Sequence, residues 1–150
     1  MALIQVDAET TVAAPPKKVY RLIADYAKDA RMEWLPANYN DYAVEQGGTG
    51  DGTVYHYKLK VGNRERTYRM AVSEPKRGSL LTEKDTASTL TNTWTVTAQG
   101  AESRVTLRTE WQGHGGVGGF FERLFAPRAL KRVYDDELAR LAAYAARQGS

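Results

Sequence analysis

The stretch GTVYHYKLKVGNRERTYRMAV, residues 52–72, decides the fold class. Apolar and polar residues alternate along its first half, so one face of this half carries Tyr55, Tyr57, Leu59 and Val61. The second half also alternates, and one of its faces carries Tyr68, Met70 and Val72. Gly62 and Asn63, between the runs, suit a tight turn. Because alternation with period two is typical of half-buried strands, the stretch predicts an antiparallel hairpin.

The same kind of pattern recurs along the chain. Further strands are predicted at about residues 3–12, 41–46, 79–85, 88–98 and 103–112, with turn residues such as Pro75, Gly78 and Gly100 between them. Two short helices are predicted, one beginning at Pro15 and Pro16 and one at residues 27–32. A long amphipathic helix is predicted from about 118 to 146, with a kink at Pro127. The order is therefore one strand, two short helices, six strands and one long helix.

Length and composition limit the function classes. The 150 residues predict a single domain spanning 1–150. Hydrophobic residues make up 42% of the chain, but no apolar run approaches the roughly 20 residues of a membrane span, so no stable membrane insertion is expected. Cysteine is absent and the first residues do not resemble a secretory signal, which favours a cytoplasmic protein. The net charge of +3, with acidic residues interspersed, argues against nucleic acid as a partner.

The string GHGGVG, residues 113–118, matches the G-x-G-x-x-G motif of dinucleotide-binding proteins. That motif acts early in a βαβ unit, with a parallel strand and an acidic residue about 20 positions further on. Here only the final predicted helix follows, and Asp135 and Asp136 lie inside it. No nucleotide cofactor, and no other cofactor, is therefore predicted.

The element order resembles that of the START-like (SRPBCC) superfamily, which includes the birch-pollen-allergen type and the polyketide cyclase/dehydrase family. The similarity is carried by the segments APPKKVYRLIADYAKDARMEWLP, GDGTVYHYKLKVG, VSEPKRGSLLTEK, TWTVTAQGAESRVTLRTEW and GGFFERLFAPRALKRVYDDELARLAAYA. The resemblance implies an α+β, helix-grip fold in which a curved seven-stranded antiparallel sheet wraps around a long C-terminal helix. It also implies a hydrophobic ligand.

A strongly curved sheet covered by one long helix is expected to leave a concave space between the two layers. The predicted ligand-binding residues are Tyr55, Tyr57, Tyr68, Met70, Asn92, Trp94, Thr109, Trp111, Phe121 and Phe125. For each of these side chains the alternative is simple core packing. As a group they predict the wall of a pocket.

Polar side chains on the inward faces would orient a ligand or assist chemistry. A buried Asn92 amide needs partners, and the Tyr57 and Tyr68 hydroxyls are potential weak acids. His56 is assigned to the outer face, although a bulge would reverse that assignment, and His114 is assigned to an exposed loop. Two histidines and no cysteine give no recognisable metal-ligand set, so no metal is predicted and catalytic residues stay unassigned.

Three function classes fit this sequence. The favoured one is a module that binds a small hydrophobic or aromatic molecule. The second is an enzyme resembling polyketide cyclases or dehydratases. The third is a protein-interaction module that uses basic clusters, for which the alternative is a simple solvated surface. The clusters are Lys58, Lys60, Arg64, Arg66 and Arg69, and Arg123, Arg128, Lys131, Arg132 and Arg140.

Overall fold

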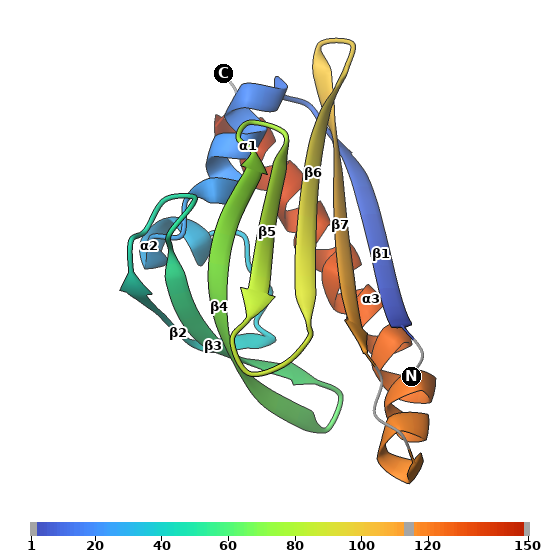
Figure 1. Cartoon of the computed structure of the whole chain (residues 1–150). Coiled ribbons are helices and arrows are strands. Elements are labelled where there is room, and N and C mark those ends of the chain that lie inside the picture. Colours follow the sequence, from blue (N-terminus) through green and yellow to red (C-terminus); the bar gives the residue numbers. More distant parts are fainter. Residues whose placement is uncertain (1–2, 113–115, 149–150) are drawn as a thin grey trace.

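The computed structural model describes the backbone at residues 3–112 and 116–148, and the side chains at residues 3–112 and 127–148. Its strands are β1 (Leu3–Val12), β2 (Tyr39–Gln46), β3 (Val54–Val61), β4 (Arg64–Lys76), β5 (Leu80–Asp85), β6 (Thr91–Gln99) and β7 (Glu102–Gln112). Its helices are α1 (Pro16–Ala24), α2 (Lys28–Arg31) and α3 (Gly116–Gln148). The strands form one antiparallel sheet in the order β1-β7-β6-β5-β4-β3-β2 (Figure 1).

The β3–β4 hairpin has the predicted register. Its facing pairs include Tyr55 with Met70, Tyr57 with Tyr68, and Val61 with Arg64. Gly62 occupies the turn with φ of +62°, a conformation that glycine adopts without steric strain. The alternation and the turn residues thus define this part of the sheet.

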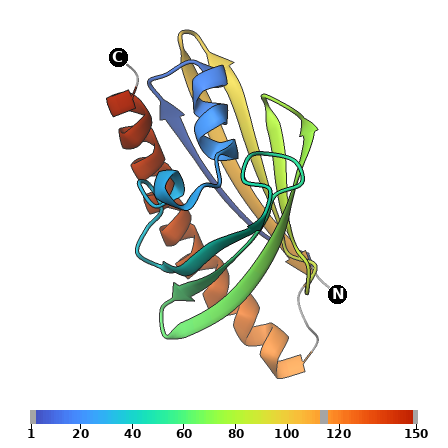
Figure 2. The same ribbon diagram turned by 90° about the vertical axis from the view of Figure 1, so that its left-hand side faces the viewer.

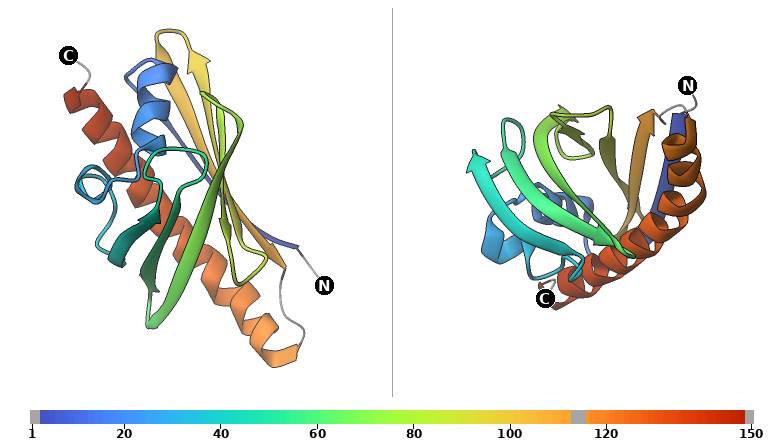
Figure 3. Two further views of the ribbon diagram at one scale, coloured as in Figure 1. Left: turned by 60° about the vertical axis from the view of Figure 1, so that its left-hand side comes forward. Right: turned by 90° about the horizontal axis from the view of Figure 1, so that it is seen from below.

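The sheet curls around α3, as the predicted helix-grip fold requires. Viewed from below, the strands form an arc, and α3 lies along its open side (right panel of Figure 3). The helix packs closely against β1. Among residues 127–148, its buried side chains are Leu130, Val133, Tyr134, Glu137, Leu138, Leu141 and Ala145. They recur at three- and four-residue spacing, so one stripe of α3 faces the core.

The two short helices close one end of the curved sheet. α1 and α2 follow β1 and lie on the same side of the sheet as α3 (Figure 2). α1 begins with Pro16, and its buried residues are Val19, Tyr20, Ile23 and Ala24. Because proline has a helix-compatible φ and needs no amide partner in the first turn, it suits this start. Trp34, beyond α2, is fully buried in the core.

The predicted inward faces are correct. Along the strands the buried residues include Ile4, Val6, Tyr55, Tyr57, Met70, Val72, Trp94, Leu107 and Trp111. His56 lies on the outer face, where its Nδ1 is 3.0 Å from Glu45 Oε2. Arg69 pairs with the same carboxylate, also at 3.0 Å. The register shifts in β2 do not turn His56 inward.

Several element boundaries differ from those predicted. β6 begins at Thr91 and not near 88, because Ser88 Oγ donates to Asp85 Oδ2 at 2.6 Å and accepts from the Leu90 amide. These side-chain bonds favour a turn over continued sheet pairing. α3 begins at Gly116, two residues earlier than predicted, and continues through Pro127. Among the described residues, no helix is long and apolar enough to cross a membrane.

Candidate functional site

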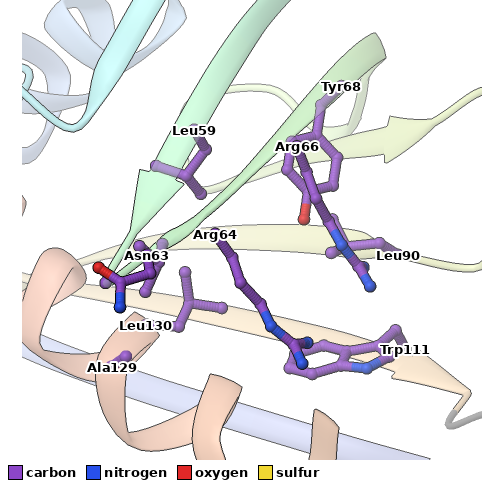
Figure 4. A pocket seen from close by; sticks show the side chains of 11 residues that line it. Leu59, Asn63, Arg64, Arg66, Tyr68, Leu90, Trp111, Ala129 and Leu130 are labelled. Carbon is purple, nitrogen blue, oxygen red and sulfur yellow. The ribbon is translucent and has the colours of Figure 1, made fainter. Parts of the chain in front are cut away.

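A pocket of about 340 Å³ lies between the β3–β4 hairpin, β7 and α3. It is lined by Leu59, Val61, Gly62, Asn63, Arg64, Arg66, Tyr68, Leu90, Trp111, Ala129 and Leu130 (Figure 4). The volume is at the lower end of the range of about 300–1,000 Å³ typical of small-molecule sites. We call this the hairpin pocket.

Apolar side chains form the walls of the hairpin pocket. Leu59 comes from β3, Leu90 from the turn before β6, Trp111 from β7 and Leu130 from α3. Each of the four is less than one-tenth exposed, which makes the wall part of the hydrophobic core. A ligand that displaces water from such a wall gains roughly 25 cal/mol per Å² of apolar surface removed from water.

Charged and amide side chains lie at the hairpin end of the pocket. Arg64 and Arg66 are two residues apart at the start of β4, so both side chains lie on the same face of the hairpin. Asn63 lies in the turn itself, and Figure 4 shows it beside Ala129 of α3. The pocket thus joins an apolar wall to a positively charged edge.

A second, much smaller cavity lies deeper between the sheet and α3. Its volume is about 20 Å³, room for about one water molecule. It is lined by Arg31, Leu35, Tyr39, Tyr42, Tyr55, Tyr57, Glu83, Asn92, Trp94, Leu107, Tyr134 and Glu137. The centre of the fold is therefore filled by protein side chains, many of them polar. We call this the inner cavity.

Glu83 of β5 is the centre of a buried hydrogen-bond network. Its Oε2 accepts from the Tyr26 hydroxyl at 2.5 Å and from Arg31 Nη2 at 3.2 Å. Its Oε1 accepts from Asn92 Nδ2 at 3.0 Å. These bonds supply partners for the carboxylate of a residue that is buried as a whole, as a buried charge requires.

Arg31 of α2 has its guanidinium between two aromatic rings. The guanidinium carbon lies 4.3 Å from the Tyr26 ring centre and 4.5 Å from that of Trp34. The same guanidinium donates to the Ile23 carbonyl. Burial alone would lower the pKa of Arg31, but Tyr26 and Glu83 raise it above its ordinary value. The group is therefore a permanent cation inside the fold.

A second set of hydrogen bonds joins the sheet to α3. The Thr109 hydroxyl lies 2.7 Å from Asn92 Oδ1 and 2.7 Å from the Tyr134 hydroxyl. Since Asn92 also donates to Glu83, the network continues from β5 across β6 and β7 to the helix. Asn92 therefore has protein partners for both ends of its amide group.

Glu137 of α3 is a buried carboxyl whose pKa is shifted upward. Burial raises its pKa to about 7, although the hydrogen bond from the Tyr39 hydroxyl, 2.6 Å from Oε1, favours the ionised form. Arg31 lowers this pKa, while Glu83 and Asp136 raise it. A carboxyl with a pKa close to neutral can both hold and release a proton at physiological pH.

Tyrosine rings separate the hairpin pocket from the inner cavity. Tyr68 lines the former and Tyr57 the latter, with ring centres 5.5 Å apart. Tyr57 also stacks on Tyr55, with ring centres 5.7 Å apart. Burial raises the pKa of Tyr57 well above its ordinary value, so its hydroxyl stays protonated. A molecule in the hairpin pocket therefore meets an aromatic partition before it reaches Glu137.

The family model described as "polyketide cyclase / dehydrase and lipid transport" matches residues 4–146 of the chain. The chain belongs to this family. Its match spans the curved sheet, both short helices and nearly all of α3, and therefore both cavities. The search of curated proteins found no match.

Solved structures with the same fold include one that is also similar in sequence. The solution structure of KanY protein is 36% identical and has a TM-score of 0.84, with 96% of this chain and 98% of that chain covered. The Zhui aromatase/cyclase from a Streptomyces species is 17% identical, with a TM-score of 0.77 and coverage of 98% and 96%. Ginseng major latex-like protein 151 from Panax ginseng is 12% identical, with a TM-score of 0.73 and coverage of 95% and 97%. The last two likenesses concern the fold alone.

In this member of the family, the residues predicted to bind ligand fall into separate groups. Tyr68 and Trp111 line the hairpin pocket. The inner cavity is lined by Tyr55, Tyr57, Asn92 and Trp94. Met70 and Thr109 are buried but line neither cavity. The side chains of Phe121 and Phe125, like His114, lie outside the described residues.

Sequence reasoning missed the buried charged residues. Glu83 has the same strand parity as Leu81 and Asp85, and Glu137 continues the buried stripe of α3 from Leu130 and Tyr134. The positions of these two residues within the apolar patterns could have identified them as buried. The position of Arg31 could not, because its helix has only four residues and is too short to show a periodic pattern. Among the described residues, no group of three or more His, Asp or Glu side chains is placed to hold a metal ion.

Proposed function

We propose that this protein binds a small hydrophobic or aromatic molecule in the hairpin pocket, between the sheet and α3. The observation that carries the proposal is the pocket of about 340 Å³ with walls of leucine and tryptophan side chains. An open apolar pocket favours ligand binding over a role confined to protein interaction. We also propose that the protein is cytoplasmic, because its sequence contains no cysteine.

Ala129 offers a direct test, because it lines the pocket from α3 with a small side chain. Ala129→Trp should fill the pocket and abolish binding of the uncharged fluorescent probe N-phenyl-1-naphthylamine. Ala139→Trp is the matched control, because Ala139 is exposed on the same helix and outside the pocket. Equal probe binding by wild type and Ala129→Trp would contradict the proposed site, provided both are folded by circular dichroism.

A second candidate function is proton transfer to an aromatic substrate, as in a polyketide cyclase or dehydratase. The observation that favours it is Glu137, with a pKa of about 7 beside the inner cavity. In this role Glu137 would exchange a proton with the substrate, and the Tyr57 hydroxyl would donate a hydrogen bond. The substrate would have to pass the Tyr57–Tyr68 partition to reach them.

The enzymatic candidate is tested with a panel of aromatic polyketide intermediates, with product formation followed by mass spectrometry. Glu137→Gln should abolish turnover, whereas Tyr57→Phe should lower kcat and leave substrate binding within a few fold, because only a transition-state contact is removed. Lys58→Ala, on the outer face next to Tyr57, is the control. Turnover that survives Glu137→Gln would rule out this role for the carboxyl.

A further inference from the structure

We propose that the ligand of the hairpin pocket is an organic anion, an apolar ring system that carries a carboxylate, with its charge paired to Arg64. This inference rests on the proposed binding function and specifies the chemical class of its ligand. The grounds for it are the position of Arg64 beside the pocket, the lack of a carboxylate partner for Arg64 among the described residues, and the aromatic wall at Trp111.

Arg64 is held at the pocket by the hairpin turn. It is the first residue of β4 and faces Val61 across the turn in the sheet register. Its backbone position is therefore fixed, while its side chain is exposed and extends across the pocket toward Trp111 (Figure 4). A ligand whose rings contact Trp111 would bring an attached carboxylate within reach of this guanidinium.

The charge of Arg64 is not neutralised within the described part of the protein. Other arginines of the sheet have carboxylate partners: Arg69 pairs with Glu45, Arg104 with Glu9, and Arg108 with Asp7. Arg64 has no such ion pair among residues 3–112 and 127–148. Arg66 lines the same pocket, whereas no Asp or Glu is among its described lining residues. Beside the apolar wall the pocket therefore carries Arg64, a cation without a carboxylate partner among the described residues.

Trp111 contributes an aromatic ring to the same wall. Its side chain is 7% exposed, and its buried Nε1 has no hydrogen-bond partner in the described part of the chain. This N–H therefore lies behind the wall, and a bound molecule would contact the apolar ring that carries it. An aromatic ring surface and a guanidinium beside one pocket are complementary to an aromatic molecule that carries a carboxylate.

Guanidinium chemistry favours a carboxylate over an uncharged polar group. The planar fork of Arg donates two parallel hydrogen bonds to a carboxylate, and ionised partners give shorter and stronger bonds than neutral ones. The apolar wall meanwhile excludes ligands without a hydrophobic body. Both requirements are met by an amphipathic anion with fused or linked rings.

The test compares naphthalene-2-carboxylate with the uncharged naphthalene-2-carboxamide, which has the same rings. Isothermal titration calorimetry with wild-type protein should give at least about 5-fold tighter binding of the carboxylate, the range expected for one partly exposed charge-assisted contact. Arg64→Gln should remove this preference and leave amide binding within about 2-fold. Lys60→Gln is the matched control, because it removes the same charge from the same hairpin outside the pocket, and it should keep the preference.

The indole N–H signals of the protein locate the bound molecule. The chain has three tryptophans, so a ¹H–¹⁵N spectrum resolves Trp111 from Trp34 and Trp94 once Trp111→Phe assigns its signal. Naphthalene-2-carboxylate should shift the Trp111 signal most. A shift confined to the other two tryptophans, or an equal loss of preference in Lys60→Gln, would overturn the inference.

Different results would contradict the anionic ligand class and the binding function itself. Equal affinity of the carboxylate and the amide for wild-type protein would overturn the anionic ligand class and keep the hydrophobic pocket. Absence of binding by either compound and by N-phenyl-1-naphthylamine would overturn the binding function together with the inference. Chemical-shift dispersion of Arg64→Gln like that of wild type establishes that its fold is intact.

Discussion

Arg31 and Glu83 form a buried ion pair, with 3.2 Å between Nη2 and Oε2, and each side chain is only 3% exposed. The pair joins the four-residue helix α2 to strand β5, which is 52 residues further along the chain. Its partners Tyr26 and Asn92 complete the hydrogen bonding of the carboxylate. The pair thus fixes the position of α2 over the inner cavity.

Removal of one member of this pair should destabilise the fold strongly. We expect Arg31→Met to lower the free energy of unfolding by about 3–5 kcal/mol, because Glu83 is left as a buried charge without its cation. The double variant Arg31→Met/Glu83→Gln should recover part of that loss. Urea unfolding followed by tryptophan fluorescence measures both values. A double variant less stable than Arg31→Met would contradict this account.

Glu137 should make stability depend on pH. Its folded-state pKa of about 7 lies above the ordinary value of 4.5, so its protonated form is favoured in the native state. The stabilisation that protonated Glu137 gives the native state is complete below about pH 4.5, and it is lost as the pH rises to about 7. A shift of this size corresponds to about 3 kcal/mol.

Glu137→Gln isolates this contribution, because glutamine resembles the protonated carboxyl. The variant should match wild type at pH 4.5 and exceed its free energy of unfolding at pH 8 by up to about 3 kcal/mol. Charged neighbours Arg31, Glu83 and Asp136 are present in both proteins, so the difference reports on position 137. A difference that does not change with pH would contradict the raised pKa.

The hydroxyl of Thr109 should stabilise the fold. Thr109→Val keeps the side-chain shape but removes bonds to Asn92 and Tyr134, so we expect a loss of about 1–3 kcal/mol in the free energy of unfolding. Thr106→Val lies on the outer face of the same strand and should change stability by less than about 0.5 kcal/mol. Thermal unfolding by circular dichroism compares the variants. Equal losses would show that strand propensity, not the network, determines the result.

The two tryptophans predicted for the site should differ in role. Trp94 packs edge-on against Trp34 at 6.0 Å in the core, so Trp94→Ala should lower stability by about 3–5 kcal/mol. Trp111→Ala should instead change the affinity for N-phenyl-1-naphthylamine, since Trp111 lines the hairpin pocket. Affinity is measured by fluorescence titration of folded variants, with Lys58→Ala as an outer-face control. A larger effect of Lys58→Ala on affinity would contradict the assigned faces.

Much of the fold was predictable because it depends on short-range patterns. The alternation around Tyr57 and Lys58 defined the faces of β3, and Gly62-Asn63 defined the turn. The start of β6 was not predictable in the same way. It depends on the Ser88–Asp85 hydrogen bond, which competes with strand pairing. Such a bond does not change the alternation of apolar and polar residues from which strands are predicted.

The division of the interior into two cavities could not be predicted from the sequence. Parity correctly placed Tyr55, Asn92 and Trp94 inside, but it carries no information on packed volume. The centre is filled because Arg31 and Glu137 enter from two helices and pack against the sheet residues. The remaining space lies at the hairpin end, beside Trp111.

The pairing of β1 with β7 has a consequence for how the chain folds. The ladder joins Leu3 to Gln112 and Val12 to Ser103, so nearly the whole sheet lies between its two strands in sequence. During synthesis β1 leaves the ribosome first but has no strand partner until β7 has emerged. Contacts of such high sequence separation slow folding, because a large loop must close before they form. The first ten residues of the sheet therefore depend on the last strand to be made.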